Sequence, residues 1–233
     1  MNSVIIVAAG RGTRMNMEIN KAFIDIDGKQ MVAHTIDTFY NCPEIDEIIV
    51  AVSKYDLNKF KEEIIKPHYF KNIKVVVGGK ERQDSIYNAL KELDPKSEIV
   101  LIHDGARPFV KEETIVKLID KTKDTGAAIV AVPVKDTVKV IDEEGMICST
   151  PNRSKLWAAQ TPQAFNRKLI VDAHEKAHNE SFLGTDDSML VERLGVKVDI
   201  VEGSYENIKI TTPEDLDIAQ MILKKSKVDM CNT

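Results

Sequence analysis

The sequence has few cysteines, and their spacing builds neither a covalent nor a metal framework. Cys42, Cys148 and Cys231 are odd in number and none belongs to a C-x-x-C pair. We therefore expect no disulfide scaffold and no zinc site, and we expect reduced thiols, as in the cytoplasm. Long basic blocks are also missing, and the net charge is −5 from 32 basic and 37 acidic residues. A nucleic-acid-binding surface is not expected on such a chain.

Long apolar segments are missing as well. No stretch approaches the roughly 18 apolar residues of a membrane span, and the N-terminus lacks a basic segment followed by a long apolar one. We therefore expect a cytoplasmic protein with no membrane contact. The 233 residues are 43% hydrophobic, which suffices for one core, and we expect a single domain over residues 1–233.

Three common catalytic or nucleotide-binding motifs are absent. The opening MNSVIIVAAGRGTRMN places Gly10 and Gly12 after an apolar run, but Met15 stands where a dinucleotide fingerprint needs its third glycine. No G-K-[ST] follows to make a P-loop, and no G-x-S-x-G nucleophile motif occurs anywhere. The turn still suits an anion, because backbone amides and guanidinium groups both bind phosphate oxygens. A plain strand-to-helix turn with solvated arginines is the alternative.

What is present is an alternation of apolar runs and amphipathic stretches. The runs predict strands, and the stretches between them predict helices such as Gln30–Tyr40, Glu81–Leu93 and Lys111–Lys123. The strand predictions are Val4–Ala8, Ile48–Val52, Ile73–Val77, Ile99–Ile102 and Ala127–Val134. This order is typical of an α/β protein: a Rossmann-like, mostly parallel sheet with helices on both faces. Ligands of such folds bind beyond the carboxyl ends of the strands.

The alternation breaks after Pro133. Two short alternating segments around Glu143-Glu144-Gly145 predict a β-hairpin over about 135–152, with too few apolar residues for a core of its own. It must lean on the main domain or on another chain. Beyond it we expect helices at about 166–178 and 186–194, strands at Val196–Val201 and Ile208–Ile210, and a last helix that begins at Pro213.

Four strand ends gather residues that could carry chemistry. The segment from Ala8 to Lys21 combines small residues with cations, and GGKERQDS ends the third strand. In HDGARP, Asp104 stands where a magnesium ion or a ribose hydroxyl would be met. The late group comprises Arg153, Gln160 to Gln163, Thr185, Asp186 and Lys209. Each group taken alone could equally be a structural turn.

One pair of histidines suggests a metal site only weakly. His174 and His178 stand four residues apart on an expected helix, but no third ligand or following glutamate accompanies them. We therefore expect both on a solvated helix face.

Seven segments in chain order resemble the 2-C-methyl-D-erythritol 4-phosphate cytidylyltransferase family. They run from about Ile5 to Leu216 and read VAAGRGTRM followed by Lys21, GGKERQDS, HDGARPF, PVKDTV, RSKLWAAQTPQAF, TDDSMLVERLG and VEGSYENIKITTPEDL. The resemblance implies transfer of a cytidylyl group from CTP to methylerythritol phosphate, with Mg²⁺ and release of pyrophosphate, in non-mevalonate isoprenoid biosynthesis. It also implies a homodimer in which a protruding arm, about 135–152, embraces the partner.

The resemblance also assigns roles to individual residues. Arg14 and Lys21 match a pair that stabilises charge at the α-phosphate, and Arg153 and Lys209 match residues that grip and aim the sugar phosphate. The substrate-binding matches are Ala8, Ala9, Gly10, Gly12, Gly79, Arg82, Ser85, Asp104, Gly105, Arg107, Thr137, Thr161, Thr185 and Asp186. Asp104 is also the candidate metal ligand.

Two alternatives stay open at this point. Ribitol-5-phosphate cytidylyltransferases share the first loop, the T-P-Q segment and N-I-K-I-T-T-P, but they differ around the base of the hairpin, where this chain has PVKDT, Arg153 and Leu156-Trp157. A non-catalytic nucleotide-binding homologue would be expected to lose Arg14, Lys21 or Asp104, and this chain keeps all three.

Overall fold

The computed structural model describes residues 1–10, 21–69 and 73–231, and of Lys21 and residues 226–231 it describes the backbone only. A seven-stranded sheet has the order β11-β7-β10-β6-β1-β4-β5. The strands of this sheet are β1 Asn2–Ala8, β4 Glu47–Val52, β5 Lys74–Val77, β6 Ile99–Asp104, β7 Ala127–Pro133, β10 Trp157–Asn166 and β11 Asp199–Glu202. All pairings are parallel except those of β10, which runs antiparallel to both β6 and β7. The expected α/β, mostly parallel sheet is confirmed.

Both faces of the sheet are covered by helices, because successive residues of the central strands point to opposite faces and are apolar on both. Along β1, Val4 and Ile6 pack into one core cluster and Ile5 into the other, and all three are fully buried. The first cluster lies under α1 (Met31–Tyr40), α2 (Leu57–Phe60) and α5 (Glu112–Thr125). The second lies under α4 (Arg82–Leu90), α6 (Arg167–Asn179) and α7 (Asp187–Glu192). A period of two with both faces apolar is the pattern of a sheet buried between helix layers.

Several elements differ from the sequence prediction. Residues 208–210 form no strand, because the backbone of Ile210 donates instead to Ala106 O at 2.9 Å in a loop. The long strand β10 was not predicted, since its sequence WAAQTPQAFN lacks both strict alternation and a β-branched run. Three short elements were also not foreseen: the pair β2 (Asp25–Ile26) and β3 (Lys29–Gln30), and the helical stretch from Leu57 to His68, which runs through α2, η3 (Lys61–Ile65) and α3 (Lys66–His68).

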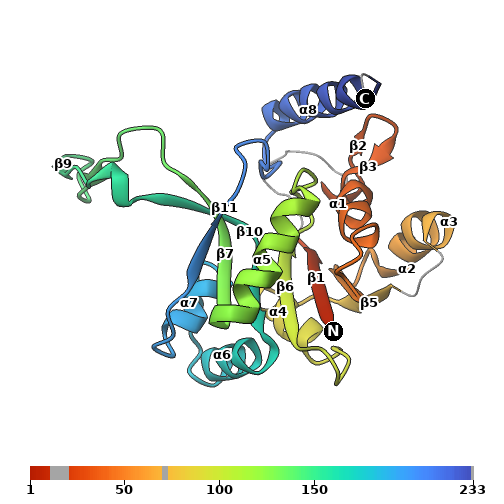
Figure 1. Ribbon diagram of the computed structural model, residues 1–233, viewed down its shortest axis with the longest axis horizontal. Helices are drawn as coiled ribbons and strands as arrows, with labels where there is room; N and C mark the ends of the chain where they lie inside the picture. Colours follow the sequence, from red (N-terminus) through yellow and green to blue (C-terminus); the bar gives the residue numbers. More distant parts are fainter. Residues whose placement is uncertain (11–20, 70–72, 232–233) are drawn as a thin grey trace.

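The predicted hairpin is present and projects away from the body of the protein (Figure 1). Its paired strands are short, β8 (Val140–Ile141) and β9 (Ile147–Ser149), and their residues are exposed. Ile141, Met146 and Ile147 expose 59%, 65% and 63% of their surface. We refer to residues 135–152 as the arm. Apolar side chains held out in solvent on a projecting hairpin are typical of a surface that another chain covers.

The last helix, α8 (Pro213–Cys231), lies at the other end of the same edge of the molecule, near β2 and β3 (Figure 1). It begins at Pro213, as predicted, and its first turn is capped because the Asp215 carboxylate accepts from the backbone of Thr212 at 2.9 Å. Among the described residues, no helix is both long enough and apolar enough to cross a bilayer.

Candidate active site

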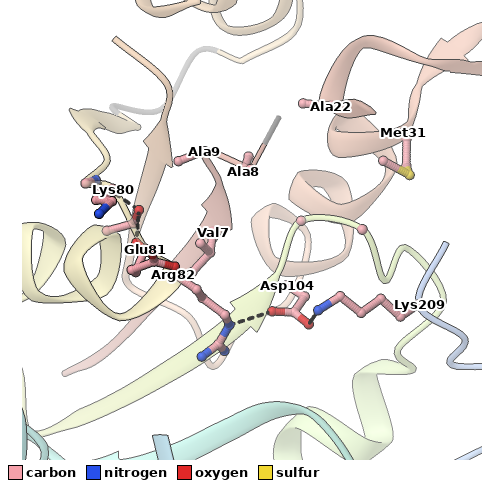
Figure 2. A pocket seen from close by; sticks show the side chains of 15 residues that line it. Val7, Ala8, Ala9, Ala22, Met31, Lys80, Glu81, Arg82, Asp104 and Lys209 are labelled. Carbon is pink, nitrogen blue, oxygen red and sulfur yellow. Dashed lines mark hydrogen bonds and ion pairs between the residues drawn. The ribbon is translucent and has the colours of Figure 1, made fainter. Parts of the chain in front are cut away.

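A cavity of about 340 Å³ opens at the carboxyl ends of β1, β5 and β6. Its walls come from the last residues of β1, the start of α4, the loop after β6 and the segment before α8 (Figure 2). The lining residues are Val7, Ala8, Ala9, Gly10, Ala22, Met31, Gly79, Lys80, Glu81, Arg82, Ser85, Asp104, Gly105, Ala106 and Lys209. The position agrees with the rule that parallel α/β sheets bind ligands beyond their strand ends.

The start of α4 forms one wall and is held by a closed set of local hydrogen bonds. Glu81 and Asp84 make a capping box, in which the backbone of Glu81 donates to the Asp84 carboxylate at 3.0 Å. The Gly79 amide donates to Ser85 Oγ at 3.0 Å, and that hydroxyl donates to Glu81 O at 3.0 Å. Position 79 has no room for a side chain, because a Cβ there would lie 2.2 Å from the Cβ of Asp84.

The loop after β6 lies against the end of β1. Gly105 N donates to Val7 O at 2.9 Å, and a Cβ on Gly105 would lie 3.0 Å from that same oxygen. On the other side, Arg107 donates to Asn207 O at 2.8 Å, and Ile210 N donates to Ala106 O at 2.9 Å. These bonds hold residues 207–210 against the loop, which places Lys209 beside the cavity.

Asp104 is the electrostatic centre of the cavity. Its carboxylate lies 3.0 Å from Arg82 Nε, 2.7 Å from Lys209 Nζ and 3.8 Å from Arg107 Nε (Figure 2). Burial alone would raise the pKa of Asp104, but the surrounding cations, Arg82 first and then Lys209, outweigh it and hold the pKa well below its usual range. Asp104 is therefore a carboxylate at all physiological pH values. Lys209, with 37% of its side chain exposed, remains within reach of a ligand in the cavity.

The buried ring of His103, next to Asp104 in β6, holds the end of this strand in place through two side-chain contacts. It is fully buried, and its ring lies 2.9 Å from Arg107 O through Nε2 and 3.2 Å from Thr161 Oγ1 through Nδ1. Burial lowers the pKa of His103 to about 4, so the ring is neutral and we assign the Nε2–H tautomer from its partners. Thr161 Oγ1 also accepts from Asp104 N at 3.0 Å. A neutral histidine and Thr161 of β10 thus set the backbone of Asp104.

The structure brings together one large group of the predicted site residues. Ala8, Ala9, Gly10, Gly79, Arg82, Ser85, Asp104, Gly105 and Lys209 line the cavity, and Arg107 and Thr161 support it from behind. Gly12, Arg14 and the side chain of Lys21 lie outside the described residues.

Four predicted residues lie elsewhere. Thr137 and Arg153 belong to the arm and its base, where Arg153 donates to Lys135 O. Thr185 and Asp186 precede α7 beside a smaller hollow of about 120 Å³ that shares only Glu81 and Arg82 with the main cavity. Asp186 serves as the N-cap of α7, where its side chain accepts from Met189 N at 3.0 Å.

Sequence reasoning was wrong about His174 and overlooked its neighbour Asp187. His174 is buried, not solvated, and its Nε2 lies 3.1 Å from Asp187 Oδ1. Asp187 Oδ2 in turn accepts from Arg82 NH1 at 2.8 Å. The available signal was the four-residue spacing of His174 from Ile170 and its one-turn distance from Ala177, which places it on the buried face of α6.

The cavity offers few ligands for a metal ion by itself. Within the described ranges, no group of three or more His, Cys, Asp or Glu side chains could hold one. Two carboxylate residues, Asp104 and Glu81, line it, and the cations around Asp104 keep that residue ionised. Such a donor set fits Mg²⁺, which keeps several waters and is commonly bound by one or two carboxylates together with substrate phosphates.

Comparison with known proteins agrees with this geometry. The family description that matches residues 2–225 is 2-C-methyl-D-erythritol 4-phosphate cytidylyltransferase. A curated protein of that name from Clostridioides difficile is 56% identical over 100% of this chain and 98% of its own length. A second, from Caldanaerobacter subterraneus subsp. tengcongensis, is 52% identical over 96% of this chain and 99% of its own length.

Solved structures give the same result. The crystal structure of 4-diphosphocytidyl-2C-methyl-D-erythritol synthase from Anaerococcus prevotii matches with a TM-score of 0.86 and 43% identity, over 96% of each chain. The enzyme from Thermus thermophilus matches with a TM-score of 0.79 and 30% identity, over 95% of this chain and 98% of that one. On the fold, the cavity and these likenesses, the chain belongs to the 2-C-methyl-D-erythritol 4-phosphate cytidylyltransferase family.

Proposed function

We propose that the chain transfers the cytidylyl group of CTP to 2-C-methyl-D-erythritol 4-phosphate and releases pyrophosphate, a step of isoprenoid precursor biosynthesis. The family membership supports this activity. The observation that carries it is the cation-ringed Asp104 at the carboxyl end of β6, inside a cavity that small residues such as Ala8, Gly10 and Gly79 also line.

The chemistry requires no covalent protein intermediate. A phosphate oxygen of the sugar phosphate attacks the α-phosphorus of CTP; that P–O bond forms as the bond to the β-phosphate oxygen breaks, and pyrophosphate leaves with the electron pair. Negative charge grows on the phosphoryl oxygens, and fixed cations stabilise it. Lys209 is the described cation best placed for this role, because its Nζ already lies 2.7 Å from Asp104 and its side chain reaches solvent. Arg14 and Lys21 are proposed to act beside it.

The cavity wall suits a cytosine nucleotide. The small residues Ala8, Ala9 and Gly10 line one part of the cavity, and Gly79 and Ser85 line it at the start of α4. Cytosine presents an amino group where uracil presents a carbonyl, so paired polar groups discriminate the two strongly. We therefore propose a preference for CTP over UTP.

We also propose Mg²⁺ as the cofactor, with Asp104 as its protein ligand. When bound, the ion would neutralise phosphate charge and orient the triphosphate. Lys209 and Arg82 would then share the Asp104 carboxylate with it.

The active assembly is proposed to be a homodimer joined through the arm. Ile141, Met146 and Ile147 are exposed there, and an isolated hairpin of this size is marginal in water. The predicted sugar-phosphate residues Thr137 and Arg153 are not among the described residues that line the cavity of their own chain. A two-fold axis would carry each arm to the other cavity and complete both sites. A cytoplasmic location stays a prediction from the sequence.

The test is pyrophosphate release from CTP with methylerythritol phosphate, with ribitol 5-phosphate as the competing acceptor and UTP as the competing donor. We expect the erythritol acceptor to be used and the other pairings to be at least about 100-fold less efficient. Equal use of ribitol 5-phosphate would reassign the substrate, and a lack of turnover with every acceptor would favour a nucleotide-binding homologue.

A further inference from the structure

Arg82 is held between two carboxylates from different parts of the chain. Its Nε lies 3.0 Å from Asp104 Oδ1 at the cavity, and its NH1 lies 2.8 Å from Asp187 Oδ2 at the start of α7. His174 of α6 lies behind, with Nε2 at 3.1 Å from Asp187 Oδ1. Exposure of the side chains falls along this row, from 30% at Arg82 to 1% at Asp187 and 0% at His174.

The rear of the row is fixed by bonds that do not involve the cavity. Gln83 donates to Phe182 O at 2.9 Å and accepts from Gly184 N at 2.9 Å, which ties α4 to the segment before α7. Ser188 N donates to Gln163 of β10 at 3.1 Å. The position of Asp187 beside Arg82 is therefore held by bonds of the protein itself and does not depend on a bound nucleotide.

The charges of the row alternate, and each member depends on its neighbour. Burial alone would raise the pKa of Asp187, but Arg82 and then His174 outweigh it, so the pKa is lowered. An ionised carboxylate at this depth persists only with such partners. Nδ1 of His174 has no hydrogen-bond partner among the described residues, so the bond to Asp187 Oδ1 is the described hydrogen bond through which the ring acts on that carboxylate.

A guanidinium group is planar and presents its donors as a fixed fork. With NH1 bound to Asp187, the plane of Arg82 is set, and Nε is directed at one oxygen of Asp104. The second oxygen of Asp104 remains with Lys209, at 2.7 Å. Without Asp187, Arg82 could turn and bind both oxygens of Asp104 side by side, which would remove that carboxylate from Lys209 and from a ligand.

We propose that Asp187 and His174 are positioning residues for cytidylyl transfer, which hold Arg82 so that it engages a single oxygen of Asp104 and leaves the other for the reaction. This inference rests on the proposed function for its kinetic readout. It assigns no contact with substrate to either residue. Both act through Arg82.

The kinetic test compares Asp187→Asn with Val191→Ala, a matched control on the same helix. Val191 is fully buried in the second core cluster and makes no bond to the row, so its truncation lowers the melting temperature by packing alone. We expect Asp187→Asn to lower kcat at least about tenfold with less than about a threefold change in KM for CTP. Val191→Ala should keep kcat within about twofold. Equal kcat for the two variants would overturn the proposal.

Two further variants at His174 distinguish a positioning role through the hydrogen bond from an effect of side-chain volume. His174→Gln can still donate to Asp187 and is expected to keep most of kcat, whereas His174→Leu fills the space without a donor and is expected to lose it. In a double-mutant cycle, Asp187→Asn should cost nothing further in an Arg82→Gln background, because Asp187 acts through Arg82. Additive losses, or a Leu variant as active as the Gln variant, would contradict the proposal.

One readout does not depend on turnover. In ¹⁵N spectra of the intact protein, the Arg82 Nε–H should exchange slowly with solvent in wild type and in Val191→Ala, and at least about tenfold faster in Asp187→Asn. If the chain proved inactive with every acceptor, this result alone would decide the positioning claim. Unchanged exchange in Asp187→Asn would overturn it whatever the activity.

Discussion

At the cavity, Asp104 has cationic partners on three sides, and the backbone around it is held by Thr161, Gly105 and the neutral ring of His103. Along the arm, by contrast, Ile141 and Ile147 stand more than half exposed, and the Arg153 side chain donates to the arm's own backbone at Lys135. The charged side chains around Asp104 are ion-paired with it within one chain, while the arm has an uncovered apolar surface. This difference is the basis for the proposal that the nucleotide half of the site is built within one chain and that the sugar-phosphate half is completed by a second.

The strongest test of the cavity is removal of the Lys209 charge beside Asp104. Lys209→Ala should lower kcat about 100-fold or more, because a fixed charge is lost where negative charge develops. Affinity for CTP should fall much less, since the proposed contacts to the base are made by other residues of the cavity. The control is Lys225→Ala, which removes the same charge from an exposed pair with Glu206 and should change kcat less than about twofold. Near-normal turnover of Lys209→Ala would remove Lys209 from the mechanism.

The arm is tested by placing charge on its apolar surface. In the double variant Ile141→Asp/Ile147→Asp, both new carboxylates would have to be buried at the proposed interface, each at a cost of several kcal/mol. We expect monomers in sedimentation at concentrations where wild type is dimeric, and turnover reduced at least about tenfold. Tyr55→Asp, at an exposed position between β4 and α2, serves as the control, because α2 lies on the opposite side of the molecule from the arm (Figure 1). A variant that stays dimeric and active would show that this surface of the arm is not the interface.

The smallest expected effect concerns His103 and the pH dependence of stability. Its folded pKa of about 4 is below the ordinary 6.5, so neutral His103 favours the fold above pH 6.5. As pH falls from 6.5 towards 4, the unfolded chain takes up a proton that the folded chain does not, and about 3 kcal/mol of unfolding free energy is lost. Urea unfolding at several pH values should show this slope in wild type. In His103→Gln the slope over the same window should be smaller.

Asp104 and Asp187 affect the stability of the fold in a different, more acidic pH range. The pKa values of Asp104 and Asp187 are lowered by folding. Each carboxylate therefore contributes fully to the unfolding free energy at pH values above the ordinary aspartate pKa, and this contribution is lost as the pH falls below that value towards the folded pKa. An identical slope in His103→Gln and wild type between pH 6.5 and 4 would assign the loss to other groups.

The sequence predicted the parallel core of the sheet well, because buried strands such as β1, β4 and β6 are continuous apolar runs between amphipathic helices. It failed at β10, whose polar residues Gln160, Thr161 and Gln163 are buried by tertiary hydrogen bonds that no local pattern reveals. The segment Ile208–Ile210 has the composition of a strand, yet bonds to Ala106 keep it in a loop that delivers Lys209.

The site was predicted to a similar extent. Motif residues at strand ends, such as Arg82 and Asp104, do meet in one cavity. Asp187 was overlooked, and His174 was wrongly expected on a solvated face, because their contacts depend on α6 and α7 packing beside α4, a long-range arrangement. For the arm, the sequence predicted a hairpin without a core of its own. What covers its apolar surface could not be predicted, because a single chain does not reveal its partner.

The most direct test of a cavity from one chain completed by the arm of another is complementation. Lys209→Ala and Arg153→Ala should each be nearly inactive alone. In a mixed dimer, one site would combine intact Lys209 with intact Arg153 of the partner subunit, and the other site would lack both. Equal mixing with free exchange makes about half of the dimers mixed, so co-refolded mutants should recover roughly a quarter of wild-type activity. No recovery, in a sample whose heterodimers are confirmed by mass spectrometry, would mean that Arg153 serves its own chain and that the shared site is wrong.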